Sequence, residues 1–250
     1  MIKRFLYFIG AFAVVMYAAV PAYASGGESA GVEDPAVGWD HLWYELMIDI
    51  WVIGLIFSVT ALYFMIRYKA KNPDDTGCGP KLSRAQALGW ALIPVFVFMA
   101  DDFYLAAKGW VLWNKYRRVP ANAVEIKVIG SQWAWEYDYG DGVTSDVMYV
   151  PAGKPVVLRM TSDDVLHSFY IPQHRVKEDM MPGRVTYLWF LARLGKTLVT
   201  CTEFCGIGHS DMYGDVVGIP EGEFDAWLSK EKTSSAAASA VEKSVELNNG

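Results

Sequence analysis

The residues best suited to chemistry lie within twelve positions near the C-terminal end. This segment reads Cys201-Thr-Glu203-Phe-Cys205-Gly-Ile-Gly-His209-Ser-Asp-Met212 and supplies two thiols, an imidazole and a thioether. Soft sulfur ligands combined with imidazole favour copper or zinc over hard cations. Methionine is a poor zinc ligand but a common weak axial ligand of copper, so the segment favours copper.

The number of thiols bears on the number of metal ions. One blue-copper centre needs one cysteine, whereas Cys201 and Cys205 together could bridge two copper ions. Each copper would then need a histidine and a weaker ligand, and His209 supplies one imidazole. The second imidazole must come from one of the remaining histidines, which are His41, His167 and His174.

The weaker ligands of such a pair would be the Met212 thioether and a backbone carbonyl, for which Glu203 is the candidate. The alternative is a Cys201–Cys205 disulfide, because disulfides form in oxidising compartments. The His and Met at fixed offsets from the two cysteines favour the metal site.

The segments that must position these ligands are predicted to be β-strands. Between residues 119 and 230, apolar and polar residues alternate with period two in many short runs separated by Pro and Gly turns, which is typical of a β-sandwich or small barrel. The strand candidates are 124–128, 133–139, 147–150, 155–160, 165–171, 184–190, 196–201 and 213–219. A short helix is predicted for 221–230, and the Ala/Ser/Lys/Glu-rich segment 231–250 is expected to be a disordered tail.

Two apolar segments precede this domain. Residues 46–68 and 85–113 are each long enough to cross a hydrocarbon core, which takes ~20 helical residues. The loop between them, 69–84, lies in a stretch rich in Lys and Arg, and the positive-inside rule places it in the cytoplasm. The alternative is a pair of buried core helices, but the basic flanks and nearby tryptophans fit a bilayer better.

The first 24 residues are expected to be a signal peptide. Lys3 and Arg4 precede an apolar run over 5–20, and Ala22-Tyr-Ala24 resembles a cleavage site. The alternative is an uncleaved membrane helix. After cleavage, residues 25–45 would form a periplasmic N-terminal segment, and the chain would sit in a bacterial inner membrane with its C-terminal domain in the periplasm.

Composition and charge narrow the function. The 250 residues are 53% hydrophobic and carry a net charge of −6, which excludes a disordered chain and argues against nucleic-acid binding. Residues 119–230 hold nine basic and fifteen acidic residues. The acidic candidates for attracting a basic protein partner are Glu136, Asp138, Asp141, Asp146 and Asp164. The alternative is an ordinary solvated acidic surface.

The two apolar segments, the stretch Asp164-Val-Leu-His167-Ser-Phe and the 201–212 motif resemble subunit II of haem–copper cytochrome c oxidase. The resemblance covers about residues 40–230. It implies an N-terminal two-helix transmembrane hairpin followed by an all-β, cupredoxin-like domain, a Greek-key sandwich or barrel, that carries the dinuclear copper centre CuA. The ligands that the resemblance implies are His167, Cys201, Cys205, His209, Met212 and the carbonyl of Glu203.

Further roles follow from the same resemblance. The Glu203 carboxylate would reach a Mg²⁺ ion shared with subunit I, and Trp133 would be the exposed ring through which the electron enters. The alternative for Trp133 is a core aromatic. One departure concerns the second membrane helix, where the family usually carries a glutamate that serves a proton path. The aligned residue here is Ala87, so that role is not carried over.

The function implied is that of the electron-input subunit of a respiratory oxidase. Electrons would come from a soluble or membrane-anchored cytochrome c and pass to haem in subunit I, which reduces oxygen to water. Subunit III is a further expected partner, and this chain would hold no oxygen site. The alternatives are the CuA subunit of a nitric oxide reductase and a membrane-anchored copper-binding or copper-delivery protein. A quinol oxidase subunit is disfavoured because such subunits lack the copper ligands.

Overall fold

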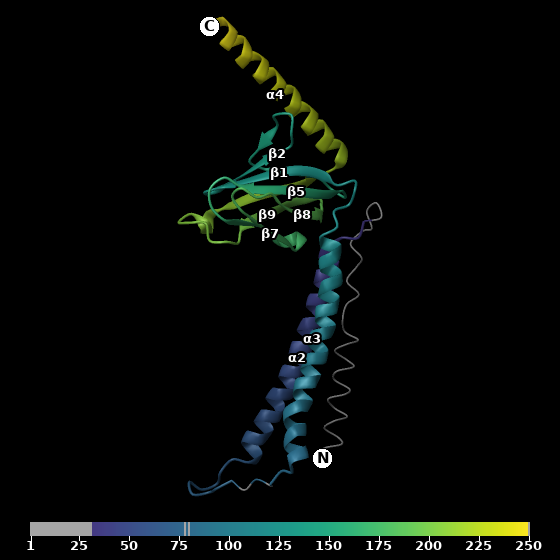
Figure 1. The fold of residues 1–250 in the computed structure, drawn as a ribbon, viewed down its shortest axis with the longest axis vertical. Coiled ribbons are helices and arrows are strands. Elements are labelled where there is room, and N and C mark those ends of the chain that lie inside the picture. Colours follow the sequence, from purple (N-terminus) through teal and green to yellow (C-terminus); the bar gives the residue numbers. More distant parts are fainter. Residues whose placement is uncertain (1–31, 78, 80, 250) are drawn as a thin grey trace. The chain divides into compact units, whose positions relative to one another are not determined.

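The computed structural model describes residues 32–77, 79 and 81–249 (Figure 1). The predicted signal peptide and Cys78 lie outside the described residues. The described chain falls into two compact units, one built on residues 40–111 and the other on residues 112–249 together with 32–39.

The first unit is a pair of long helices. Helix α2 spans Pro35–Arg67 and helix α3 spans Arg84–Tyr116, and both are long and apolar enough to cross a membrane. Their apolar windows are not buried within the protein, as expected for side chains that face lipid. A salt bridge between Glu45 and Lys108 joins the two helices, with a nitrogen–oxygen distance of 2.5 Å.

The second unit is a sandwich of two five-stranded sheets. The first has the strand order β3-β2-β1-β5-β8, and the second β4-β10-β9-β6-β7. Their bounds are β1 Val124–Ser131, β2 Ala134–Asp138, β3 Thr144–Ser145, β4 Met148–Pro151, β5 Pro155–Ser162, β6 His167–Ile171, β7 Val176–Met180, β8 Thr186–Leu191, β9 Gly195–Cys201 and β10 Tyr213–Ile219. The predicted fold class, a helical hairpin followed by an all-β cupredoxin-like domain, is confirmed.

The core lies between the sheets because alternate residues of each strand point inward. In β1, Ile126 and Val128 are fully buried while Glu125 and Lys127 face solvent. Most ladders are antiparallel, but β1 pairs with β5 and β10 pairs with β4 in parallel. The largest buried side chains come from both sheets and include Tyr137, Phe169 and Phe190.

The C-terminal helix α4 spans Glu221–Asn249. The structure therefore differs from the prediction of a disordered tail over 231–250. This segment is rich in Ala, Glu and Lys, which are strong helix formers, so a helix begun at Glu221 can continue through it. Two short 3₁₀ turns, η1 (Pro172–His174) and η2 (His209–Asp211), are the remaining elements in the described part of the chain.

Candidate metal centre

The loop between β9 and β10 carries most of the candidate ligands. Strand β9 ends at Cys201, and β10 begins directly after Met212. The backbone N–H of Cys201 donates to the carbonyl of Met212 at 3.1 Å, which closes the loop at its base. On the neighbouring strand β6, the carbonyl of Ser168 accepts from the N–H of Thr202 at 3.0 Å, so His167 is held beside the same loop.

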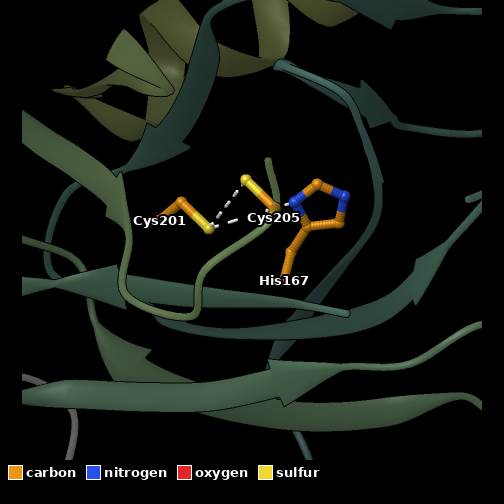
Figure 2. A group of neighbouring side chains, drawn as sticks. All are labelled: His167, Cys201 and Cys205. Carbon is orange, nitrogen blue, oxygen red and sulfur yellow. Dashed lines mark hydrogen bonds between the residues drawn. The ribbon is translucent and has the colours of Figure 1, made fainter. Parts of the chain in front are cut away.

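Two thiols and one imidazole form the centre of the site (Figure 2). The Sγ atoms of Cys201 and Cys205 are 3.8 Å apart, and Nδ1 of His167 is 3.9 Å from the sulfur of Cys201. The candidate ligand atoms of these three residues all lie within 4.8 Å of one another. All three side chains are buried, so a metal ion held here would be shielded from water.

The remaining predicted ligands approach the same two sulfurs. Nδ1 of His209 lies 3.5 Å from the sulfur of Cys205, and the thioether sulfur of Met212 lies 3.7 Å from it. The carbonyl oxygen of Glu203 is 3.1 Å from the sulfur of Cys201. The structure thus brings together the donor atoms of all six residues that the family resemblance implied.

The other two histidines lie elsewhere. His174 ends the turn η1 and packs against Phe190, with ring centroids 4.6 Å apart. His41 lies in α2 and contacts Glu45 within the helical unit. The position of His167 opposite the thiols could not be read from strand spacing alone, because it depends on the pairing of β6 with β9.

The Asp164 carboxylate fixes the orientation of the His167 ring. Its Oδ1 lies 2.9 Å from Nε2 of His167 and accepts the backbone N–H of Val165 at 2.6 Å, while Oδ2 accepts the backbone N–H of Gln132 at 2.6 Å. Burial raises the pKa of Asp164, but the hydrogen bonds from His167 and the two amides outweigh it and lower the pKa to about 2. The ionised carboxylate therefore holds Nε2 and leaves Nδ1 facing the sulfurs.

The sequence predicted Asp164 only as a candidate for docking a basic partner and did not indicate this role. The Asp-x-x-His spacing is a signal that could have indicated it, since a carboxylate three residues before a histidine can reach its ring. Gln132 was likewise missed as a support: its side-chain Nε2 donates to the carbonyl of Cys205 at 2.7 Å.

Trp133 lies in the turn between β1 and β2, beside the ligand loop. Its side chain is 42% exposed, so it is not a core residue. Trp135, two residues further along, is buried and meets the His167 ring edge-on with centroids 5.9 Å apart. The two tryptophans therefore lie in different environments, one at the surface and one in the core.

The acidic side chains proposed for docking fall into two groups. Asp164, which adjoins His167, and Glu136, an exposed residue of β2, lie toward the Trp133 turn. Asp138, Asp141 and Asp146 lie at or beyond the far end of β2. Lys127 pairs with Asp138 at 3.3 Å, and Lys232 pairs with Asp141 at 2.9 Å.

The donor set suits a soft metal ion. Burial, together with the neighbouring thiol of Cys201, raises the pKa of Cys205 to about 11, so the thiol stays protonated without a cation. A bound metal ion would favour the deprotonated thiolate over the thiol, because the thiolate is the form that binds metal. Two thiols, two imidazole nitrogens, a thioether and a carbonyl fit copper, for which thioether and thiolate donors select.

Comparisons with known proteins bear on the family of this chain. Residues 143–218 match the family model described as "Cytochrome C oxidase subunit II, periplasmic domain". The chain is 30% identical over 234 residues to the alternative cytochrome c oxidase subunit 2 of Bradyrhizobium diazoefficiens, covering 79% of this chain and 83% of that protein. It is 29% identical to cytochrome c oxidase subunit 2 of Cereibacter sphaeroides, covering 78% and 77%.

Among solved structures, the periplasmic domain of subunit II of cytochrome oxidase from Bradyrhizobium japonicum aligns with a TM-score of 0.44 and 29% identity. The alignment covers 47% of this chain and 99% of that one. The extent of the match to the Bradyrhizobium diazoefficiens subunit confirms the resemblance inferred from the motif. The chain belongs to the cytochrome c oxidase subunit II family and is a membrane-anchored subunit of a haem–copper oxidase.

Proposed function

We propose that this chain is the electron-input subunit of its oxidase and that its β-sandwich binds two copper ions as a CuA centre. The observation that carries the proposal is the convergence of four further donor atoms on two buried sulfurs that lie 3.8 Å apart. One histidine lies near each sulfur, His167 near Cys201 and His209 near Cys205. This arrangement supports two metal ions that share both thiolates.

The chain's own residues would hold and tune such a centre. When bound, the copper pair supplies a one-electron redox couple. The two cysteines, His167, His209, Met212 and the Glu203 carbonyl would be its ligands. Asp164 fixes the imidazole of His167, and the Gln132 amide holds the carbonyl of Cys205, so two supports outside the ligand set limit movement of the site.

Electron input is assigned to Trp133, which is exposed and lies against the ligand loop. A basic cytochrome c would be attracted by the acidic side chains around this turn. Glu136 and Asp164 are the nearer candidates, whereas Asp138, Asp141 and Asp146 would contribute at longer range. An acidic surface steers a basic partner and raises its association rate in a salt-dependent manner.

The remaining partners follow from the family. Subunit I would receive the electron at its haem and reduce oxygen, and subunit III would complete the complex. The exposed Glu203 carboxylate would contribute to a Mg²⁺ site at the contact with subunit I. Helices α2 and α3 would cross the bacterial inner membrane, with the basic 69–84 loop in the cytoplasm and the β-sandwich in the periplasm.

The test is copper loading of the purified chain in detergent, followed by metal analysis and electron paramagnetic resonance. Two coppers per chain, with a hyperfine pattern from one electron shared over two equivalent nuclei, are expected, as is oxidation of reduced cytochrome c by the assembled oxidase. One copper with a four-line pattern, or a Cys201–Cys205 disulfide without copper, would contradict the proposal. Rapid loss of copper to a weak chelator would favour a copper-delivery protein.

A further inference from the structure

Trp133 rests directly on the backbone of the ligand loop. A Cβ atom added at Gly208 would lie 2.5 Å from Cδ2 of the Trp133 indole and 2.8 Å from its Cγ and Cε3. A Cβ added at Gly206 would lie 3.3 Å from Cζ2 of the same ring and 2.9 Å from Nε2 of Gln132. The indole therefore covers the loop between Cys205 and His209 at two positions that have no side chain.

We propose that Gly208 is a positioning residue for electron input. Its missing side chain allows the Trp133 ring to contact the backbone that joins two candidate copper ligands. The inference rests on the proposed function, in which Trp133 passes the electron to the centre. This electron transfer then depends on direct contact between the Trp133 ring and the ligand loop.

The backbone conformation of Gly208 separates this role from an ordinary requirement for glycine. Its φ is −85° and its ψ is 11°, the conformation of the third residue of a type I turn, which most residue types adopt, so the backbone here does not require glycine. Gly206, by contrast, has a φ of +122°, which disfavours any side chain regardless of its neighbours. A methyl group at Gly208 therefore acts only through the space that the indole occupies.

The neighbouring turn cannot easily retreat from such a methyl group. The backbone N–H of Gln132 donates to Asp164 at 2.6 Å, and its side chain donates to the carbonyl of Cys205 at 2.7 Å. Because Cγ of Trp133 is among the atoms approached, a rotation about χ2 would not relieve the contact. The ring itself must move off the loop, and electron transfer slows steeply as a through-space gap widens.

The experiment places Gly208→Ala in the complete oxidase and measures, by anaerobic stopped flow, the reduction of the copper centre by reduced mitochondrial cytochrome c. We expect a rate about ten-fold or more below the wild type, in line with the cost of small misplacements. Copper content and the paramagnetic resonance spectrum should stay unchanged. Gly222→Ala is the matched control, because a Cβ at that helical position meets no atom within 4 Å.

A second variant tests whether Gly208 acts through the ring. With Trp133→Phe as background, adding Gly208→Ala should cause little further loss, since coupled residues are not additive. Reduction by ascorbate with tetramethylphenylenediamine, which needs no protein docking, should be equally fast in all variants. Additive losses, an altered copper spectrum, or a wild-type rate in Gly208→Ala would overturn the inference. A wild-type oxidase that takes no electron from the cytochrome would instead overturn the proposed function.

Discussion

At the scale of single residues, the negative charge of Asp164 could serve either of two roles, to hold the His167 ring or to attract a basic protein partner. Both of its oxygens accept hydrogen bonds from within the chain, so we expect its main role to be the support of His167 and not the attraction of a partner. We predict that Asp164→Ala weakens copper binding about 10- to 100-fold, the usual effect of removing the partner of a ligating histidine. Competition with a chelator of known affinity measures this.

The matched control is Asp163→Ala, which removes an adjacent exposed acid and the same charge. Copper affinity should be unchanged in this variant. If Asp164 served docking alone, both variants would keep their copper and would differ from the wild type only in the salt dependence of cytochrome c oxidation.

His174 is the buried titratable group with the clearest consequence for stability. It is 2% exposed, and neither ring nitrogen has a hydrogen-bond partner among the described residues. Burial, with a smaller contribution from Arg193, lowers its pKa from an ordinary 6.5 to about 4. The folded chain thus binds fewer protons than the unfolded chain between these values, so its stability is complete above pH 6.5 and falls as the pH drops toward 4.

We predict that this histidine accounts for up to about 3 kcal/mol of the stability lost over that pH range. His174→Leu, which has a similar volume and no charge, should flatten the pH dependence of the unfolding midpoint between pH 6.5 and 4. The measurement is thermal unfolding of the purified chain followed by near-ultraviolet circular dichroism. A slope equal to that of the wild type would assign the pH dependence to other groups.

At the scale of elements, the first turns of α4 attach the helix to the sandwich. Phe224 is 3% exposed, and the Trp227 ring lies against Tyr139 and Tyr149 with centroids 4.9 and 4.7 Å away. We predict that Phe224→Ala lowers the free energy of unfolding of the sandwich by about 3 kcal/mol, the usual loss for a buried phenylalanine. Lys230→Ala, an exposed change in the same helix, should leave the unfolding midpoint unchanged in the same denaturation experiment.

The elements also show what a sequence can predict. The alternation of apolar and polar residues predicted most strands, because one face of each strand is buried, as in 124–128 within β1. Strand β7 (Val176–Met180) was missed because its middle residues, Lys-Glu-Asp, are all charged and only its ends are buried. The β-sheet pairing supplies what alternation does not: β7 pairs with β6, so Met180 lies opposite His167.

The candidate site likewise has parts that the sequence predicts and parts that it does not. The 201–212 loop was predictable because its ligands are close in sequence. The choice of His167 among three histidines came from family resemblance, since it depends on the β6–β9 pairing. The contact between Trp133 and Gly208 could not be predicted at all, because it joins two loops that meet only in the folded sandwich.

At the scale of the whole molecule, the chain combines a helical hairpin with a sandwich, and only the sandwich holds the candidate ligands. A single unfolding temperature therefore does not describe the protein, because the two units need not unfold together. A ligand that binds only the folded sandwich should shift the transition of that unit alone.

Copper should act as such a ligand. We predict that saturating copper, at about 1,000 times its dissociation constant, stabilises the sandwich by about 4 kcal/mol for each copper ion bound. The unfolding temperature of the sandwich, followed in the near-ultraviolet, should then rise. The unfolding temperature of the helical hairpin in detergent, followed in the far-ultraviolet, should stay unchanged. A Cys201→Ser, Cys205→Ser double variant should show no copper-dependent shift, because both thiols are gone. A shift that persists in this variant would mean that copper stabilises the sandwich through other residues, and the 201–212 loop would not be its site.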